Sequence, residues 1–412
     1  MNKILVDFAK KHYHIRKLGR FLLNKKKQLQ YLPYFYRYKI NDKVIIFECF
    51  NGRNYTCSPQ AIYEKMIKMK QFKDYKFVWS FIDINKHEVM KSDNLIIVKH
   101  GSKDYYKYFS MAKYWIVNSI VDEGIMKKKN QIYVQCWHGT PLKRLRYDIN
   151  VEGEGFNSIS EIRKRNDLDA SRFDYFISPS RYATEKFISA FNLEKLGKSN
   201  IIIEEGYPRN DSLFNYSEDK VNNIKKKLNV PLDKKVIFYL PTFRDNQHKS
   251  GVGYVYDLMI DFESLRKKFK DKYVFLFSSH YFVANKINVD KYKDFVINVS
   301  GYDDINELYI ISDIIMTDYS SIFFDFANLK RPMIFYMYDL KLYKNQLRDF
   351  YIDIDELPGP ITQTQAELES VLENIDKIKL KYQDKYKKFN KCFNYLDDGN
   401  ASLRVIKKIF KK

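Results

Sequence analysis

Short runs of β-branched and aromatic residues alternate with amphipathic stretches along most of this sequence. The runs predict buried strands at Val44–Phe50, Phe77–Ile82, Leu95–Lys99, Trp115–Ser119, Tyr133–Trp137, Tyr175–Ser178, Val236–Leu240, Val274–Ser278, Phe295–Val299, Ile314–Thr317 and Met333–Tyr336. Helical spacing is found between several of them, at Gln60–Met69, Tyr105–Ala112, Phe262–Phe269, Ile305–Ile311 and Ser321–Asn328. Continuously apolar strands that alternate with helices indicate parallel sheets covered on both faces.

The predicted strands are too many for one ordinary open sheet, so we expect two doubly wound α/β domains. The polar, Lys-rich segment Tyr216–Lys235 is the best boundary between them. The predicted division is a basic segment at 1–42, α/β domains at 43–215 and 216–395, and a C-terminal helix at 396–412. Two such domains facing each other would bring the carboxyl ends of their strands to a central cleft, where open α/β sheets bind ligands.

Positive charge is concentrated at the N-terminus. The chain has a formal net charge of +21, which favours an anionic partner. Residues 1–45 contain twelve Lys or Arg against Asp7 and Asp42, and His12–Gln30 places apolar residues near a helical period. A basic amphipathic helix suits an anionic membrane surface. A solvated helix packed on the body of the protein would show the same pattern, so both interpretations stay open.

Several protein classes are disfavoured. No stretch is apolar enough for a transmembrane helix, and cations interrupt any signal-peptide core. The four cysteines form no CxxC pair, which disfavours a zinc ribbon or a disulfide framework and indicates a reducing compartment. P-loop, GxGxxG, HExxH and GxSxG motifs are absent. The acidic triplets Asp167–Asp169 and Asp353–Asp355 are interpreted as surface groups, so neither a metal nor a cofactor is expected.

Two histidines follow predicted strands in different domains. His138 stands in the segment QCWHGTPLK, and His280 follows Ser278 and Ser279. An imidazole beside polar, flexible backbone can act as a general base, although a His that only caps or packs a turn would look the same. Because the predicted fold directs both side chains into one cleft, the pair together favours a functional role.

The segment Thr317–Ser321 lies between a predicted strand and an apolar helix. Free N–H groups at a helix start, together with Ser and Thr hydroxyls, form a phosphate site. Ordinary N-capping would need only one of these side chains, so we favour phosphate binding. Two further loops, GYPRND and LPTFRD, place Arg209 and Arg244 where they could clamp phosphate oxygens, and a structural Arg–Asp pair in each loop fits equally well.

Together these segments resemble the CDP-glycerol glycerophosphotransferase family of teichoic acid primases and polymerases. The likeness runs from about Lys43 to about Arg404, with the family's motifs in order: QCWHGTPLK, SPSRYATEKF, GYPRND, YLPTFRD, SSH, TDYSSIFFDF, LPGP and DDGNAS. Two departures stand out. The family often has Arg-Gly-Phe-Tyr where this chain has Arg348-Asp349-Phe350-Tyr351, and the chain is shorter than polymerases with a large extra N-terminal region.

The resemblance implies a GT-B-like α/β fold and transfer of glycerol phosphate or ribitol phosphate from a CDP-alditol to a hydroxyl of a membrane-linked acceptor, releasing CMP. It places such an enzyme peripherally at the cytoplasmic face of the cell membrane, in teichoic acid or capsule synthesis. His138 would be the base, and His280 would contact the donor phosphate or protonate the leaving group. Expected donor-binding residues are Arg209, Asn210, Asp211, Arg244, Thr317, Asp318, Ser320 and Ser321; expected acceptor-side residues are Gly139, Thr140 and Lys143.

Two other functions are kept as alternatives. A nucleotide-sugar glycosyltransferase of the same fold would break a glycosidic bond instead of a phosphoanhydride. A non-catalytic nucleic-acid-binding protein would fit the charge and the 17 % aromatic content. Most aromatic residues fall in predicted buried strands, not on an exposed sheet that could stack bases, so no nucleic-acid partner is expected.

Overall fold

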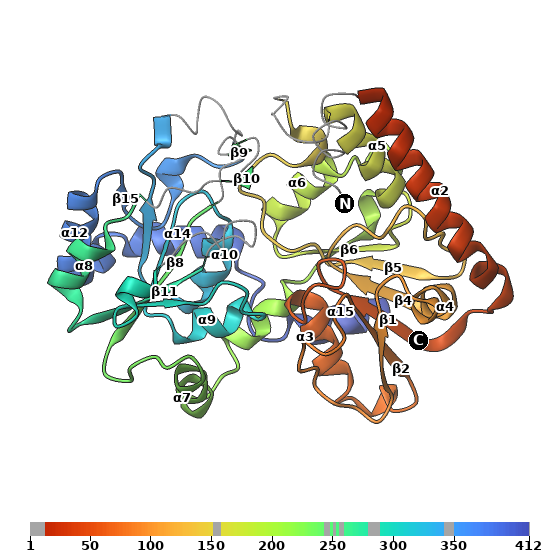
Figure 1. The fold of residues 1–412 in the computed structure, drawn as a ribbon, viewed down its shortest axis with the longest axis horizontal. Helices are drawn as coiled ribbons and strands as arrows, with labels where there is room; N and C mark the ends of the chain where they lie inside the picture. The colour runs from red at the N-terminus through yellow and green to blue at the C-terminus, as the bar shows by residue number, and fades with distance from the viewer. Residues whose placement is uncertain are drawn as a thin grey trace.

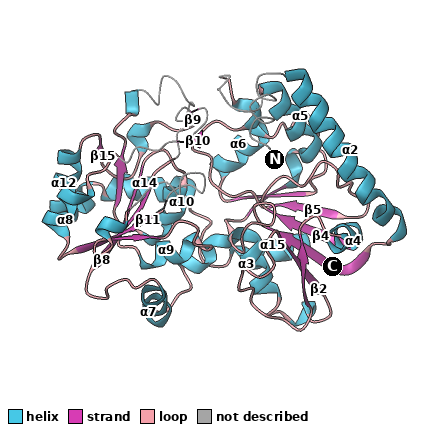
Figure 2. Cartoon of the chain, viewed as in Figure 1, coloured by secondary structure: helices cyan, strands magenta, loops and turns pink. Residues whose placement is uncertain are grey.

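The computed structural model describes residues 13–150, 158–242, 248–249, 253–254, 259–278, 289–341 and 350–411. Two α/β units lie side by side (Figure 1), and each has a sheet flanked by helices (Figure 2). The first unit contains α2 (Tyr13–Arg37), β1 (Asn41–Glu48), α3 (Cys57–Met66), β2 (Lys76–Phe81), β3 (Leu95–Lys99), α4 (Lys103–Met111), β4 (Ala112–Val117), β5 (Ile132–Gln135), α5 (Ile159–Ala170), β6 (Tyr175–Ser178), α6 (Arg181–Ala190) and β7 (Ile202–Glu204).

The second unit follows the short 3₁₀ helix η4 (Pro208–Leu213). It contains α7 (Glu218–Lys227), β8 (Lys235–Leu240), β9 (His248–Lys249), β10 (Gly253–Tyr254), α8 (Phe262–Phe269), β11 (Tyr273–Phe277), β12 (Val296–Asn298), α9 (Ile305–Ile311), β13 (Ile314–Thr317), α10 (Ile322–Phe326), η6 (Ala327–Leu329), β14 (Met333–Tyr336), β15 (Ile361–Thr362), α12 (Gln365–Glu373), α13 (Ile375–Lys381) and α14 (Gln383–Phe393). The last helix, α15 (Ala401–Ile409), returns to the first unit.

The first sheet has seven parallel strands in the order β3-β2-β1-β4-β5-β6-β7. On β1, Val44 and Ile46 pack against residues of α2, α4, α5 and α6. The alternate residues Ile45 and Phe47 pack against α3 and α15 on the other face. Because both faces are covered, successive strand residues are all apolar, and burying each large side chain contributes about 1.5–3 kcal/mol.

The second sheet has six parallel strands in the order β12-β11-β8-β13-β14-β15. One face packs against α9, α10 and α14, and the other against α8 and α12. These two units confirm the predicted parallel α/β fold, and each predicted strand is present. Three features were missed: the edge strands β7 and β15, which are too short to give a pattern, and the antiparallel pair β9–β10.

Candidate active site

The candidate base follows β5 at the carboxyl edge of the first sheet. Trp137 has a φ of +50°, in the left-handed region that a residue with a side chain rarely adopts. Its buried ring packs edge-on against Phe191, with 4.9 Å between centroids. The next side chain, His138, is exposed. The strained turn thus buries one aromatic ring and presents the following imidazole to solvent.

The tautomer of His138 is set by one hydrogen bond. Nδ1 lies 2.8 Å from the backbone carbonyl oxygen of Asn118. A carbonyl can only accept, so Nδ1 carries the proton and Nε2 keeps its lone pair. The ring also packs beside Phe50 and Trp137, with centroids 5.4 and 4.2 Å away. Nε2 is therefore the atom that can take a proton from a substrate hydroxyl.

Electrostatics keep His138 neutral near pH 7. Its pKa is lowered to about 4, first because protein surrounds the ring, and further by the positive charges of Arg209 and Arg146. The bond to Asn118 opposes this shift. Protein crowds the ring while part of its surface stays accessible to water. With its pKa well below 7, the imidazole is in its base form at neutral pH.

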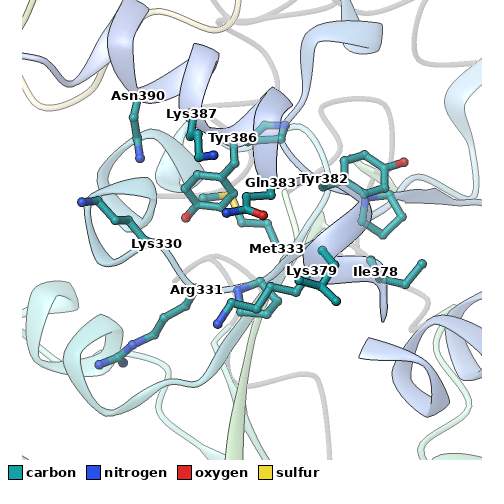
Figure 3. Close-up of a pocket in the computed structure, with 15 residues that line it drawn as sticks. Lys330, Arg331, Met333, Ile378, Lys379, Tyr382, Gln383, Tyr386, Lys387 and Asn390 are labelled. Atoms are coloured by element: carbon teal, nitrogen blue, oxygen red, sulfur yellow. The ribbon is translucent and has the colours of Figure 1, made fainter. Parts of the chain in front are cut away.

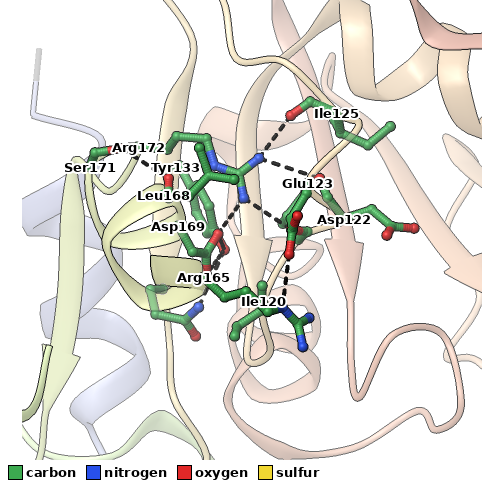
Figure 4. Close-up of polar contacts among 12 residues, drawn as sticks. Ile120, Asp122, Glu123, Ile125, Tyr133, Arg165, Leu168, Asp169, Ser171 and Arg172 are labelled. Atoms are coloured by element: carbon green, nitrogen blue, oxygen red, sulfur yellow. Dashed lines mark hydrogen bonds and ion pairs between the residues drawn. The ribbon is translucent and has the colours of Figure 1, made fainter. Parts of the chain in front are cut away.

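The loop that supplies the Asn118 carbonyl is held by a half-buried arginine, Arg172 (Figure 4). Arg172 donates to the carbonyl oxygens of Val121 (2.9 Å) and Ile125 (2.8 Å), and it pairs with the carboxylate of Asp169 at 2.5 Å. These charge-assisted bonds fix the chain just after β4. Because the Asn118 carbonyl orients His138, the position of His138 depends indirectly on Arg172, which follows α5, and on Asp169 within α5.

The two strongest candidate segments meet across the units. A Cβ atom built on Gly139 would lie 3.1 Å from the Oγ atom of Ser321. Ser321 stands at the N-terminal end of α10, and among the described contacts its hydroxyl makes no capping hydrogen bond. The structural alternative, in which the Ser321 hydroxyl only caps α10, therefore finds no support in these contacts. Glycine beside His138 lets the loop of the first unit approach this hydroxyl of the second.

Thr317 and Asp318, two of the expected donor-binding residues, make hydrogen bonds within the protein. The Thr317 hydroxyl donates to the carbonyl oxygen of Leu240 at 2.7 Å. Asp318 Oδ1 accepts from the backbone N–H groups of Thr242 (2.8 Å) and Tyr319 (2.6 Å). Both side chains are buried, and they tie the ends of β8 and β13 together. Ser320 and Ser321 are half-buried at the same turn.

Arg209 lies in the contact between η4 and α10 that connects the two units, which we call the joint. Its Nη2 atom bonds both oxygens of Asp325 in α10, at 2.9 and 2.7 Å, and both side chains are buried. Burial alone would lower the pKa of Arg209, but the Asp325 carboxylate outweighs it and raises the pKa above its ordinary value. The structure thus shows an Arg–Asp pair, as one sequence interpretation allowed. Its partner lies in another motif, not in the same loop as expected.

The neighbours of Arg209 complete this joint. Asn210 Nδ2 donates to Asp325 (3.1 Å) and to Asp397 (2.7 Å). Asp211 accepts from the N–H groups of Ala401 and Ser402, at 2.8 Å each, and so caps α15. Burial raises the pKa of Asp397 to about 6. Asn210 and Asp211 thus bind protein groups at this joint, and their expected contacts with a donor stay a prediction.

The expected acceptor-side residues lie where the first unit touches the second. Thr140 is buried beside Gly139, and Lys143 forms a backbone bridge with Phe350. The adjacent Leu142 carbonyl accepts from the N–H of Tyr351 at 2.9 Å. Phe350 and Tyr351, the described part of the segment in which this chain departs from the family pattern, therefore lie directly against the QCWHGTPLK loop.

Two predicted residues, His280 and Arg244, lie outside the described residues. Asn118, Asp325 and Asp397 were missed: a backbone carbonyl has no sequence signal, and the two carboxylates find their partners far along the chain. A cavity of about 620 Å³ also opens between the units, lined by residues of α3 and α9 and by Arg209. Within the described part of the chain, no cluster of His, Cys, Asp or Glu is suited to a metal ion.

Comparisons with known proteins agree with one another. The family model "CDP-Glycerol:Poly(glycerophosphate) glycerophosphotransferase" matches residues 31–411. A teichoic acid poly(glycerol phosphate) polymerase of Bacillus spizizenii is 40 % identical over 373 residues, covering 90 % of this chain and 92 % of that protein. A teichoic acid glycerol-phosphate transferase of Staphylococcus aureus is 40 % identical over 375 residues, covering 90 % and 94 %.

A third relative and a solved structure extend this result. The polymerase of Staphylococcus epidermidis is 42 % identical over 366 residues, which cover 88 % of this chain but 50 % of that protein, so the chain spans about half its length. A structure of the wall teichoic acid polymerase TagF superposes with a TM-score of 0.86 at 39 % identity, covering 98 % of this chain and 97 % of that one.

Proposed function

Because the chain belongs to the CDP-glycerol:poly(glycerophosphate) glycerophosphotransferase family, we propose that it transfers an alditol phosphate, glycerol phosphate or ribitol phosphate, from a CDP-alditol to a hydroxyl of a polyol-phosphate acceptor. The family and the GT-B-like arrangement of two parallel-sheet units are as the sequence predicted. One observation carries the proposal. His138 is neutral, its Nε2 atom keeps its lone pair, and the ring lies beside the close approach of Gly139 to the Ser321 hydroxyl.

The geometry supports a direct displacement. Nε2 of His138 removes the proton of the acceptor hydroxyl, and the oxygen attacks the phosphorus that carries the alditol. The phosphoanhydride bond breaks and CMP leaves. The Asn118 carbonyl holds Nδ1–H and so stabilises the imidazolium that forms. Ser320, Ser321 and the N–H groups of the following turn would bind the pyrophosphate, with His280 and Arg244 as further predicted donor contacts.

Product analysis tests this activity. The protein is incubated in parallel with CDP-glycerol, CDP-ribitol and UDP-sugars, each with a lipid-linked polyol-phosphate acceptor. The product masses are then measured by mass spectrometry. We expect mass increments of one or more alditol phosphates and equimolar CMP. Sugar transfer from a UDP-sugar without alditol phosphate transfer would instead establish the glycosyltransferase alternative.

Removing the Ser321 hydroxyl should weaken donor binding. A hydrogen bond to a charged group is typically worth about 1.5–3 kcal/mol, so Ser321→Ala should raise the Kd for CDP-glycerol roughly ten- to a hundredfold. Calorimetry on the two variants Ser321→Ala and Ser370→Ala, the second an exposed serine on α12, measures this difference. An unchanged Kd with a sharply lower Tm would mean that Ser321 serves the fold and not the donor.

We further propose that α2 holds the protein at the cytoplasmic face of the membrane. One side of α2 packs on the first unit: Lys27 pairs with Asp122 at 2.8 Å, and the Tyr31 hydroxyl donates to the Met126 carbonyl at 3.0 Å. The helix also exposes apolar side chains by 50–67 %, namely Ile15, Leu18, Phe21, Leu22, Leu23 and Leu29. In the part of the chain that the structure describes, no helix is long and apolar enough to span a bilayer.

This anchor predicts a specific loss of vesicle binding. The double variant Leu18→Glu/Leu22→Glu removes two exposed leucines, each worth about 1.5–3 kcal/mol when buried, and adds two negative charges. We expect at least a tenfold loss of binding to vesicles that contain phosphatidylglycerol, with transfer to a water-soluble acceptor preserved. Leu232→Glu, an equally exposed leucine on the second unit, is the matched control. Equal binding by both variants would exclude α2 as the anchor.

A further inference from the structure

A second cavity, of about 510 Å³, lies on the second unit between the start of β14 and helices α13 and α14 (Figure 3). We call it the distal pocket, because none of the candidate active-site residues lines it. Its walls are largely apolar and include Pro332, Met333, Pro360, Ile378, Leu380 and Tyr382. The volume falls within the range of about 300–1,000 Å³ that is typical of small-molecule sites.

The charged residues of the distal pocket are all basic. Lys330, Lys379 and Lys387 are exposed residues that line it, and among the described lining residues there is no Asp or Glu. Arg331 contributes its stem, because its guanidinium donates to the carbonyl oxygens of Ile310 (2.7 Å) and Ser312 (2.6 Å). Lys387 pairs with Asp384 at 3.3 Å, but both side chains are well exposed, so the pair is weak.

The framework of the pocket is firmly built. A Cβ atom on Gly359 would lie 2.2 Å from the carbonyl oxygen of Met333, so the LPGP turn packs directly on β14. The opposite wall, α14, is fixed by Asn390, which donates to the carbonyl of Ala327 at 3.0 Å, and by Asn394, which donates to that of Phe324 at 2.7 Å. The active site gives the LPGP motif no role. Here it shapes a cavity that exists before any ligand binds.

We propose that the distal pocket binds an anionic amphiphile, an alkyl chain that ends in a phosphate headgroup. The apolar walls would take the alkyl chain out of water, and the lysine ammonium groups would bind the phosphate oxygens. A free phosphate would gain nothing from the apolar walls, and a cationic amphiphile would be repelled by the three lysines. Both parts of the ligand are therefore required for binding.

Calorimetry with alkyl phosphates below their micelle concentrations tests the proposal. Each buried CH₂ group should raise the affinity about fourfold while the cavity has room, so affinity should climb from hexyl to decyl phosphate and then level off. Inorganic phosphate and decyltrimethylammonium should not bind measurably at the same concentrations. Equal affinity for the cationic amphiphile, or no dependence on chain length, would overturn the proposal.

Matched variants locate the site. Lys379→Glu/Lys387→Glu reverses two charges at the pocket and should weaken decyl phosphate binding at least tenfold. Lys388→Glu/Lys391→Glu makes the same change at exposed positions on α14 that do not line the pocket, and it should leave binding unchanged. Equal loss in both pairs would mean general charge attraction and would refute a site here.

Vesicles distinguish the two sources of such a ligand. Phosphatidylglycerol and phosphatidylcholine vesicles are sedimented with both pairs of lysine variants, each made in the Leu18→Glu/Leu22→Glu background so that α2 does not hold the protein on the vesicle. If only Lys379→Glu/Lys387→Glu loses binding to phosphatidylglycerol vesicles, the natural ligand is a lipid of the bilayer. If that pair loses decyl phosphate but keeps vesicle binding, the pocket serves a free amphiphile. Either result supports the distal pocket, and retention of decyl phosphate by that pair refutes it.

Discussion

Replacing His138 with alanine should lower kcat by roughly 10²–10⁴, the usual cost of losing a general base. The acceptor alcohol is a poor nucleophile at neutral pH, and Nε2 of His138 is held neutral with its lone pair available. The Kd for CDP-glycerol should stay within about threefold, because the proposed donor contacts come from the second unit. Turnover with a defined acceptor and calorimetric donor binding are measured on the same preparation.

The pH dependence separates a base from a merely structural histidine. The free-enzyme profile, kcat/KM against pH, should lose activity on its acidic side as the pH falls through about 4, because the pKa of His138 is lowered to about 4. In His138→Gln this acidic limb should disappear along with most of the activity. A variant within threefold of the parent turnover, or an unchanged acidic limb, would rule out His138 as the base.

The same shift affects stability in a defined direction. The unfolded chain binds a proton at His138 near its ordinary pKa of about 6.5, whereas the folded chain resists protonation. The stabilisation of the folded state by neutral His138 is therefore fully present above about pH 6.5. It is lost as the pH falls from there toward the folded-state pKa.

The fold could be predicted from sequence because the strands are buried on both faces. A run such as Val44–Phe47 is apolar at every position only when helices cover both sides of the sheet, and the structure shows this packing. The edge strands β7 and β15 have three and two residues and leave no comparable run. Likewise, no local pattern could reveal that α15 returns to complete the core of the first unit.

The candidate site was predictable only in part. His138 and Ser321 both follow strands, so the rule that ligands bind at carboxyl ends anticipated their meeting. The partner of Arg209 was not predictable, since an Arg beside Asn and Asp suits either a phosphate or a carboxylate. Its actual partner, Asp325, is 116 positions away in sequence. The fixed tautomer of His138 depends on a backbone carbonyl, which any residue at position 118 would supply.

Removing only one member of the buried Arg209–Asp325 pair should destabilise the folded protein. In Arg209→Met, the Asp325 carboxylate would stay buried, with side-chain exposure of 8 %, and would lose its guanidinium partner. Removing one member of a buried ion pair typically costs about 3–5 kcal/mol, and we expect that loss in the free energy of unfolding. Denaturant unfolding of the parent, Arg209→Met, Asp325→Leu and the double variant measures it.

The double variant decides between the structural role and the phosphate clamp. If the pair serves the joint, Arg209→Met/Asp325→Leu should recover much of the lost stability, because two apolar side chains can replace a buried pair at little cost. Donor affinity should then follow stability and return with it. If instead Arg209→Met unfolds like the parent while its Kd for CDP-glycerol rises tenfold or more, Arg209 leaves Asp325 to bind the donor. In that case the sequence-based prediction that Arg209 binds donor phosphate would be right. The Arg209–Asp325 pair would then belong to the donor-free state of the enzyme.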